Sequence, residues 1–555
     1  MIEQPPQRAL RSLPVLDVVS PTAISPPGVR EPRPAAESLD GRLAEFRPED
    51  QVLPRFFVWT LGCQMNRSDS EEMAGRLLAS GCAEASSMDQ ADLVVINTCA
   101  IREAAEQKVI GRQGHLANLK RANPGLRVVL TGCSVREAER EGLRRRYPAV
   151  DLFLRPDEEP ELVERLGLAG AQAPVGLSPR TAATGVAQQR AVGVADHLAD
   201  SRATAIAGDL VRRDSPTHAW LPIIYGCDKS CTYCIVPFSR GPERSRPFDE
   251  IVAEARHLAE LGYQDVTLLG QNVNSYGHDL PTDERFGHIA TERWGGRRLD
   301  LNARPDLAEL LRAIDAIRAV DGGQGIPRLR FVTSHPWDLS DRLIAAMSEC
   351  RSVCEHLHLP VQSGDDGVLR RMGRQYTIEH YLERLGRIRA TVPGIALSTD
   401  VIVGFPGETD EQFRRTLDLL RHVRYDTVFA AAFSPRPGTP AQRLPDDVPP
   451  AEKRLRLNEL LAVQEGIALE RTTGWLGRTT EVLVDTVTRA RGHDHEDGPA
   501  QAGRAAPPRP GEVNLSGRNR ENRLVHLTGP AHLVGHLAQV RIAHAGPYAL
   551  RGVLA

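Results

Sequence analysis

Three cysteines in the segment GCDKSCTYC carry the strongest chemical signature in the sequence. Cys227, Cys231 and Cys234 follow the spacing C-x3-C-x2-C. Three thiolates can hold a 4Fe-4S cluster and leave one iron without a protein ligand. The amino and carboxylate groups of S-adenosylmethionine can chelate that iron, so that one electron from the cluster cleaves the sulfonium and yields an adenosyl radical. Tetrahedral zinc is the alternative, but zinc usually needs a fourth Cys or His ligand nearby, and the motif contains none.

Three further cysteines occupy equivalent places in the first part of the chain. Cys63, Cys99 and Cys133 each end a short apolar, β-branched run: FFVWTLGC, ADLVVINTC and LRVVLTGC. Helical patterns separate these runs, which predicts an α/β domain with a parallel sheet over residues 54–166. The carboxyl ends of parallel strands share one edge, so we expect the three thiols to converge. A buried structural role is the alternative for any one of them, but three in equivalent positions favour an iron–sulfur cluster with one open iron.

Residues 216–465 contain the first cysteine motif and then repeated strand signals, such as YQDVTLLGQNVNSYG and IALSTDVIVGFPGET. Amphipathic segments such as DEIVAEARHLAELG stand between them. This alternation predicts a partial or full (β/α) barrel, whose chemistry belongs at the carboxyl ends of its strands. In the GFPGE segment, Gly404, Gly407 and Glu408 indicate a tight turn at such an end, where the backbone could approach a cofactor closely.

Residues 470–555 alternate apolar and polar positions between turns, which predicts a small antiparallel β-barrel. A Pro- and Gly-rich stretch at 489–512 is expected to be a loop inserted into it. Residues 471–555 contain eleven arginines and seven acidic residues, whereas the whole chain has a net charge of −3. This positive excess favours a phosphate backbone as partner, with a solvated basic surface as the alternative. The candidates for phosphate contact are Arg518, Arg520 and Arg523.

Composition limits the class of protein. At 555 residues the chain is too long for one core, so we expect about three or four domains. The sequence contains no run of about 18 apolar residues, the length needed to cross a bilayer, which argues against a membrane protein. Residues 1–53 lack the pattern of a secretory signal and are expected to form a disordered tail, with a linker at 167–215. Nine cysteines without an export signal indicate a reducing compartment, so we expect a cytoplasmic protein.

Ordered motifs cover almost all of residues 55–550 outside the insertions. They include TLGCQMNRSDSEEM, INTCAIREAAEQK, LTGCSVRE, YGCDKSCTYCIVPFSRGPERSRP, SHPWDL, CEHLHLPVQSGDDGVLRRMGR, LSTDVIVGFPGETDEQF and SPRPGTPA. With these motifs the chain resembles the radical S-adenosylmethionine (radical SAM) methylthiotransferases. The resemblance implies that the central domain is a radical SAM core and that the C-terminal barrel is an RNA-binding TRAM module.

The resemblance also implies a division of labour between the cysteines. Cys227, Cys231 and Cys234, which we call the radical triad, would hold the radical SAM cluster. Cys63, Cys99 and Cys133, which we call the auxiliary triad, would hold a second 4Fe-4S cluster linked to the inserted sulfur. One S-adenosylmethionine would give a methyl group to sulfur and another the radical, so we expect no acid/base dyad to dominate. Candidates for cofactor contact, by their position at strand ends, are Gly270, Gln271, Asn272, Ser398, Asp400 and Gly404; polar residues at such ends also cap helices.

Four functions fit these features. The favoured one is methylthiolation at C2 of N6-dimethylallyladenosine (isopentenyladenosine) at position 37 of tRNA, next to the anticodon, and the second is the same reaction on threonylcarbamoyladenosine. Methylthiolation of a ribosomal-protein aspartate fits less well, because a barrel that binds a basic protein should be acidic. A non-enzymatic iron–sulfur RNA-binding protein would leave the open-iron motif without purpose. We also expect an electron donor such as flavodoxin or ferredoxin, an iron–sulfur carrier and a monomeric state.

Several residues are predicted to have only structural roles. His356 and His358 alternate along a predicted strand and are expected to be buried and hydrogen-bonded. Phe433 stands where the family usually has a tyrosine, which removes a hydroxyl. Three cysteines match no cluster motif and are expected in the core: Cys82, Cys350 and Cys354.

Overall fold

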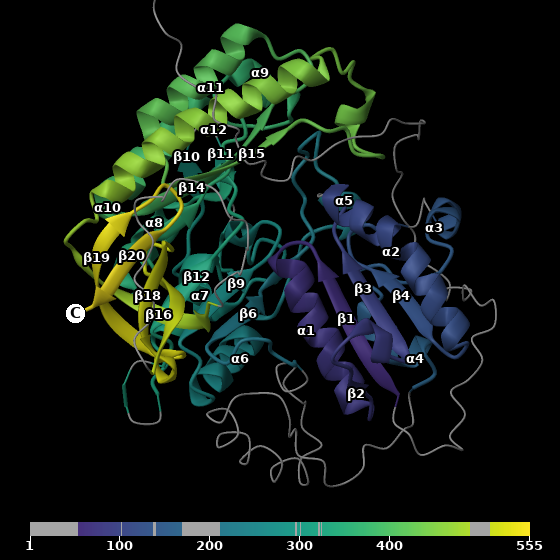
Figure 1. The fold of residues 1–555 in the computed structure, drawn as a ribbon. Helices are drawn as coiled ribbons and strands as arrows, with labels where there is room; N and C mark the ends of the chain where they lie inside the picture. Colours follow the sequence, from purple (N-terminus) through teal and green to yellow (C-terminus); the bar gives the residue numbers. More distant parts are fainter. Residues whose placement is uncertain are drawn as a thin grey trace, which may run out of the picture.

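The computed structural model describes residues 54–100, 103–136, 140–168, 211–294, 297–299, 301–319, 322–323, 325–488 and 511–555. The tail predicted at 1–53 lies outside these residues, as do most of the linker predicted at 167–215 and of the insertion predicted at 489–512. The described chain forms an N-terminal α/β unit, a central (β/α) unit and a small C-terminal barrel (Figure 1). Among these described ranges, no helix is long and apolar enough to span a bilayer.

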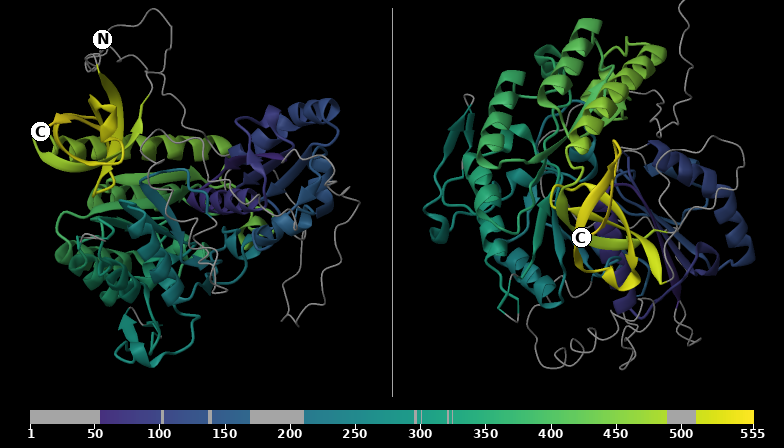
Figure 2. Two further views of the ribbon diagram at one scale, coloured as in Figure 1. Left: turned by 90° about the horizontal axis from the view of Figure 1, so that it is seen from below. Right: turned by 60° about the vertical axis from the view of Figure 1, so that its left-hand side comes forward.

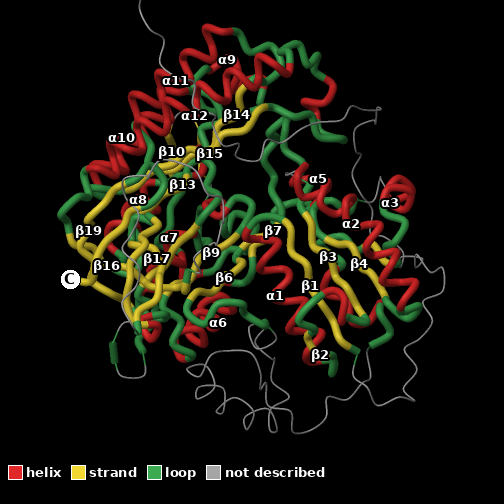
Figure 3. The backbone as a smooth tube through the Cα atoms, in the orientation of Figure 1, coloured by secondary structure: helices red, strands yellow, loops and turns green. Residues whose placement is uncertain are grey.

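The N-terminal unit is a five-stranded parallel sheet, in the order β2-β1-β3-β4-β5, with helices on both faces (Figure 3). Val94 and Leu130 enter one apolar cluster with residues of α2, whereas Val95 and Val129 enter another with residues of α1. Burial on both faces explains why the strands are continuous apolar runs. The elements are β1 (Arg55–Leu61), α1 (Gln64–Ala79), β2 (Ala83–Glu84), β3 (Leu93–Thr98), α2 (Glu103–Ala122), β4 (Arg127–Thr131), α3 (Arg140–Arg146), β5 (Leu152–Phe153) and α4 (Leu162–Arg165).

The central unit contains six parallel strands in two sheets, β6-β9-β12 and β13-β14-β15. A parallel bridge between Leu329 and Val353 joins them, so the strands form the predicted partial (β/α) barrel. Strands and helices share one large apolar core. The elements are β6 (His218–Pro222), β7 (Ile224–Tyr225), α5 (Val236–Ser239), β8 (Arg244–Ser245), α6 (Phe248–Glu260), β9 (Asp265–Leu269), β10 (Glu292–Trp294), β11 (Arg297–Leu299), α7 (Leu307–Asp315), β12 (Arg328–Phe331), α8 (Asp341–Glu349), β13 (His356–His358), α9 (Asp366–Arg371), α10 (Ile378–Thr391), β14 (Ala396–Val403), α11 (Asp410–Val423), β15 (Thr427–Ala432) and α12 (Pro450–Thr473).

The C-terminal unit is a closed five-stranded barrel around its own apolar core. All its strand pairs are antiparallel except β18 and β20, which are parallel. The predicted small antiparallel barrel is confirmed, and one of its pairs is parallel because a closed ring with an odd number of strands cannot alternate direction throughout. The strands are β16 (Thr479–Val487), β17 (Glu512–Asn519), β18 (Leu524–Pro530), β19 (Leu537–Ala545) and β20 (Leu550–Leu554).

The long helix α12 connects the central unit to the C-terminal barrel. It runs without a break through residues 465–470, where the sequence predicted a domain boundary, and ends at Thr473. In Figure 1 and in the left view of Figure 2, the barrel and the N-terminal unit lie on opposite sides of the central unit. The N-terminal unit contacts the central unit through ion pairs such as Asp69–Arg240, and the barrel does so through pairs such as Arg520–Glu355.

Arginines hold the barrel against the central strands. Buried Arg330 donates to Asp265 at 2.9 Å and to the carbonyls of Asn519 and Arg520. The carboxylate of Asp426, which is also buried, accepts from Arg471 at 2.7 Å and from Arg523 of the barrel. Asp426 thus joins α12 and the barrel to the start of β15.

Replacing Asp426 with asparagine should destabilise the protein markedly. The change leaves Arg471 and Arg523 without their carboxylate, and breaking one side of a buried ion pair costs about 3 kcal/mol of free energy of unfolding. Urea denaturation measures this loss. Asp418→Asn is the matched control, because the Asp418–Arg421 pair is exposed and contributes little. Equal losses in the two variants would contradict this role of Asp426.

Candidate metal centres

The auxiliary triad lies at one edge of the N-terminal sheet, as the sequence predicts. Cys63 follows β1 and is the N-cap of α1, Cys99 directly follows β3, and Cys133 lies two residues after β4. The three strands are neighbours, with Leu61 paired to Thr98 and β3 paired to β4. Sheet topology therefore brings together thiols that are distant in sequence.

Hydrogen bonds order two of these thiols. A hydrogen bond from Cys99 is the main cause that lowers the pKa of Cys63 to about 6, and burial opposes it. The Cys63 thiol lies 3.4 Å from the Asn66 side-chain oxygen, and Asn66 in turn donates to buried Asn97 at 2.8 Å. A thiol with a low pKa provides the thiolate that a metal requires.

Cys133, the third thiol, contacts the central unit. Arg240 donates from Nε to Cys133 Sγ at 3.2 Å and from Nη2 to Asp69 at 2.6 Å. Burial raises the pKa of Cys133, and the positive charge of Arg240 opposes that effect. Burial also raises the pKa of Asp69, again against the charge of Arg240.

The radical triad lies in a loop between β7 and α5. The N–H of Cys227 donates to the carbonyl of Gly241, and that of Cys234 to the carbonyl of Cys231, each at 3.1 Å. Burial raises the pKa values of Cys227 and Cys234 to about 12. Such thiols stay protonated until a positively charged centre such as iron displaces the proton.

Residues after β9 support the radical triad, close to where the sequence predicted cofactor contacts. Gln271 accepts a hydrogen bond from the N–H of Gly226, directly before Cys227. Asn272 donates at 2.8 Å to Asp338, which pairs at 2.6 Å with Lys229 inside the triad loop. Gly270 has no space for a side chain, because an added Cβ would lie 2.4 Å from Ile224.

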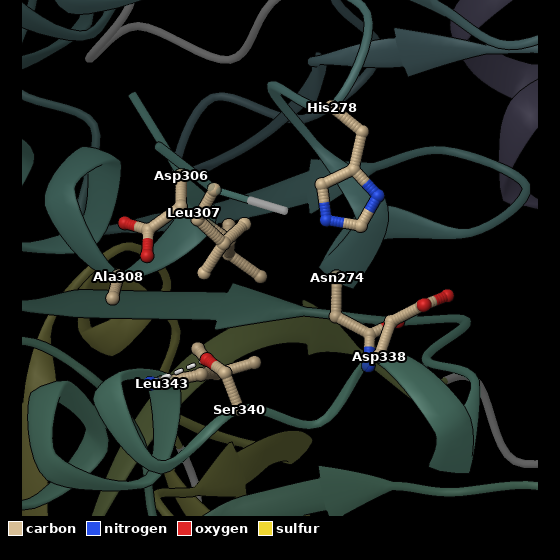
Figure 4. Close-up of a pocket in the computed structure, with 9 residues that line it drawn as sticks. Asn274, His278, Asp306, Leu307, Ala308, Asp338, Ser340 and Leu343 are labelled. Carbon is tan, nitrogen blue, oxygen red and sulfur yellow. Dashed lines mark hydrogen bonds between the residues drawn. The ribbon is translucent and has the colours of Figure 1, made fainter. Parts of the chain in front are cut away.

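Asp338 also lines a small pocket with Asn274, His278 and Ser340 (Figure 4). Its volume of about 10 Å³ holds at most one water molecule, so it cannot take a cofactor. The pocket therefore belongs to the polar support of the triad loop rather than to a ligand site.

The other three predicted cofactor contacts lie on or after β14. Ser398 hydrogen-bonds His356 at 3.0 Å and His358 at 2.9 Å, and Asp400 lies 3.4 Å from His358. Gly404 has a φ of +66°, and a Cβ there would meet Lys453 at 2.4 Å. The close approach at Gly404 is therefore explained by Lys453 of α12. Ser398 hydrogen-bonds both histidines as expected, but His356 and His358 are half-buried rather than buried.

The two triads are neighbours across the boundary between the units. Ala100 and Cys133 form a buried cluster with Ile235, which directly follows Cys234. The structure therefore places Cys133 of the auxiliary triad against the segment that carries the radical triad.

Among the described residues, no three Cys, His, Asp or Glu side chains are arranged to hold a single metal ion. In a 4Fe-4S cluster each cysteine binds its own iron, so the thiols stand further apart than the ligands of one ion. Neither motif contains a nearby fourth thiolate, which tetrahedral zinc would need. Two sets of three cysteines therefore suit two 4Fe-4S clusters better than zinc.

In each triad, one cysteine follows a glycine whose backbone conformation other residues rarely adopt. Gly132, before Cys133, has a φ of +92°, and an added Cβ would lie 2.2 Å from the carbonyl of Thr98. Gly226, before Cys227, has a φ of +75°, and its Cβ would lie 2.0 Å from the carbonyl of Pro242. Both thiols are thus placed by tight packing of backbone on backbone.

Replacing Gly226 with alanine should displace Cys227 and strongly reduce iron binding at the radical triad. A Cβ contact of 2.0 Å with backbone cannot be relieved by rotating a side chain. Iron analysis after anaerobic reconstitution measures the effect. Gly386→Ala is the control, since nothing lies within 4 Å of its added Cβ in α10. Full iron content in Gly226→Ala would contradict the role of this turn.

Two of the three arginines predicted to contact phosphate have other partners. Arg520 donates to Glu355 at 2.7 and 2.9 Å, and Arg523 donates to Asp426. Both therefore serve the contact between barrel and central unit, which argues against them as phosphate contacts. Arg518 is exposed and donates to the carbonyl of Asn522 in its own turn.

The remaining predicted structural residues lie in the core. Phe433 is buried against Phe405, with ring centroids 4.9 Å apart, in the place where the family usually has a tyrosine. The three cysteines without a cluster motif are buried, as predicted: Cys82, Cys350 and Cys354.

Sequence reasoning missed the residues that surround the thiols. Arg240, Asp69 and Asn66 are ordinary polar residues in the sequence, and only the fold places them beside cysteines. A local signal was available for the glycines, since Gly62, Gly132 and Gly226 each stand immediately before a cysteine of the two triads.

Comparison with known proteins gives two family matches. Residues 221–420 match the radical SAM superfamily, and residues 55–155 match the uncharacterized protein family UPF0004. The structure of a radical S-adenosylmethionine methyltransferase, TsrM, from Kitasatospora setae has a TM-score of 0.46 and 15% identity over 69% of this chain and 75% of that chain.

Several curated relatives align over most of their length. A tRNA-2-methylthio-N(6)-dimethylallyladenosine synthase of Thermoanaerobacter sp. (strain X514) is 38% identical over 500 residues, which cover 90% of this chain and 92% of that protein. The protein of the same name from Carboxydothermus hydrogenoformans is 39% identical, and the alignment covers 90% of this chain and 99% of that protein. A third, from Roseiflexus sp. (strain RS-1), is 39% identical over 522 residues, covering 93% of each chain.

Proposed function

The chain belongs to the radical SAM methylthiotransferase family, and from this membership we propose that it transfers a methylthio group to C2 of N6-dimethylallyladenosine at position 37 of tRNA. The product is 2-methylthio-N6-dimethylallyladenosine. One observation carries the proposal: Cys133 of the auxiliary triad packs in a buried cluster with Ile235, which directly follows Cys234 of the radical triad. A reaction that needs a radical and a sulfur atom at one carbon requires such proximity.

The residues around the triads fit the groups that the family uses. We assign one 4Fe-4S cluster to each triad and S-adenosylmethionine to the radical triad. Beside that triad, three buried polar atoms have no hydrogen-bond partner among the described residues: Gln271 Nε2, Asn272 Oδ1 and Arg374 Nη1. Each of these groups could bond the carboxylate or the amino group of an amino acid bound beside the triad. Cysteines that form no disulfide in both triads, and unused polar atoms beside one of them, therefore support the assignment.

When bound, the radical cluster supplies the electron that cleaves S-adenosylmethionine, and the auxiliary cluster supplies the sulfur that is inserted. The chain's own residues hold and orient these groups. Arg374 donates to the Tyr233 hydroxyl at 2.7 Å, and Thr232 is held by the carbonyls of Met372 and Arg371. The triad loop is thus fixed on both sides, by the end of α9 and by the residues after β9.

We assign tRNA as the macromolecular partner, and Arg518 on the barrel is the candidate for phosphate contact. The proposed chemistry needs an external electron, for which a flavodoxin or ferredoxin is suitable, and a carrier that rebuilds the clusters. No cysteine of the described chain is in a disulfide, which accords with a reducing, cytoplasmic location. We propose that the protein acts as a monomer, since both triads lie within one chain.

The experiment compares three substrates. The protein is reconstituted anaerobically with iron and sulfide and given S-adenosylmethionine and a reductant. Parallel reactions contain tRNA with N6-dimethylallyladenosine, tRNA with threonylcarbamoyladenosine, or a small-subunit ribosomal protein. Mass spectrometry of the digested products should find the methylthio group only in the first. Product in the second or third reaction alone would replace the proposed substrate while keeping the reaction type.

A further inference from the structure

Arg240 belongs to the central unit, but its guanidinium contacts a cysteine of the N-terminal unit. Its Nε donates to Cys133 Sγ at 3.2 Å, and its Nη2 donates to Asp69 at 2.6 Å. The exposed fractions are 6% for Arg240, 6% for Asp69 and 3% for Cys133. Both hydrogen bonds are therefore shielded from water, where charge-assisted bonds act most strongly.

The two bonds of Arg240 have different consequences. The bond to Asp69 neutralises the buried guanidinium and fixes its orientation. The ion pair with Asp69 does not require a second partner, yet the N–H on Nε also donates to the Cys133 sulfur. On the proposed function, this sulfur is a ligand of the auxiliary cluster. An N–H bond to a thiolate ligand stabilises the electron-rich reduced cluster and so raises its reduction potential.

The position of Arg240 in the chain links it to the other triad. Arg240 directly follows α5 (Val236–Ser239), which begins two residues after Cys234. In the same turn, Ile235 packs against Cys133. One short segment therefore carries a ligand of the radical triad and the donor to a ligand of the auxiliary triad.

We propose that Arg240 is a positioning residue that holds the Cys133 thiolate and raises the reduction potential of the auxiliary cluster. Asp69 orients the guanidinium for this bond. The inference rests on the assignment of Cys133 to that cluster, which is part of the proposed function.

A nearby cavity provides a matched control. A space of about 350 Å³ between the N-terminal and central units is lined by Asp69, Arg240 and Arg76, among others. Arg76 bonds Glu72 at 2.7 Å, a neighbour on its own helix. Replacing Arg76 removes a cation from the same cavity and leaves the Cys133–Arg240 bond in place.

The test measures the reduction potential of the auxiliary cluster in the reconstituted full-length protein, by redox titration monitored by electron paramagnetic resonance. The auxiliary cluster is the component whose signal is lost when Cys63, Cys99 and Cys133 are replaced by alanine. The variants are Arg240→Gln, Arg240→Lys, Asp69→Asn and the control Arg76→Met. Iron content is measured in each.

In Arg240→Gln, the one-electron reduction of the auxiliary cluster should become about tenfold less favourable, a shift of about 59 mV to lower potential. Arg240→Lys should recover part of the shift, Asp69→Asn should show a smaller shift of the same sign, and Arg76→Met should match the wild type. If Arg240→Gln loses the auxiliary iron, recovery of that iron in Arg240→Lys supports the positioning role.

Unchanged potentials in both Arg240→Gln and Asp69→Asn, at full iron content, would overturn the inference. So would an equal shift in Arg76→Met, because that change leaves the thiol contact intact. Failure of the proposed function is distinguishable: Cys133→Ala would then retain all the iron of the wild type.

Discussion

Replacing Cys231 with alanine should abolish cleavage of S-adenosylmethionine and formation of the methylthio nucleoside. The variant removes one of three thiolates that we assign to the radical cluster, and two thiolates cannot present an open iron in the same way. The expected loss of turnover is at least about 10³-fold, the scale seen when an essential catalytic group is removed. Adenosyl cleavage and product are both measured by mass spectrometry.

The affinity of Cys231→Ala for tRNA should be nearly unchanged, because the proposed phosphate contact lies on the C-terminal barrel. Cys350→Ala is the control. Cys350 is a buried core thiol of the same unit, so its replacement should lower stability modestly and leave turnover in place. Retained modification by Cys231→Ala would contradict the assignment of the radical reaction to this triad.

Replacing Cys133 with alanine should separate the two halves of the reaction. The variant disrupts the auxiliary triad but leaves every thiol of the radical triad, so cleavage of S-adenosylmethionine should continue while the methylthio product falls by at least about 10²-fold. Both quantities are measured in the same reaction with N6-dimethylallyladenosine-containing tRNA.

Cys82→Ala is the matched control for this variant, since Cys82 is buried in the same N-terminal unit and burial raises its pKa to about 11. It should form product at close to the wild-type rate. Loss of cleavage and product together in Cys133→Ala would mean that the two triads do not act separately.

The sequence was sufficient to predict the units and both triads because those signals are local. Runs of β-branched residues ending in a cysteine identify strands and their carboxyl ends, and parallel pairing then places Cys63, Cys99 and Cys133 on one edge. The spacing in GCDKSCTYC needs no structure to be recognised. The same patterns identified the alternating strands and helices of the central unit.

Contacts between distant residues could not be predicted in this way. Arg520 and Arg523 stand in a basic segment, but their carboxylate partners, Glu355 and Asp426, come from the central unit. The turn at Gly404 was predicted to let a cofactor approach the backbone closely, whereas the side chain of Lys453 in α12 fills the space beside it. In each case the deciding neighbour lies tens of residues away, and only the packed fold brings it close.

Iron analysis of three proteins tests the central claim most directly: that two cysteine triads from different units each hold a cluster. After anaerobic reconstitution the wild type should contain about eight iron atoms per chain, as two 4Fe-4S clusters require. A variant with Cys63, Cys99 and Cys133 replaced by alanine should retain about four, and so should a variant with Cys227, Cys231 and Cys234 replaced. About four iron atoms in the wild type, or undiminished iron in either variant, would contradict the account.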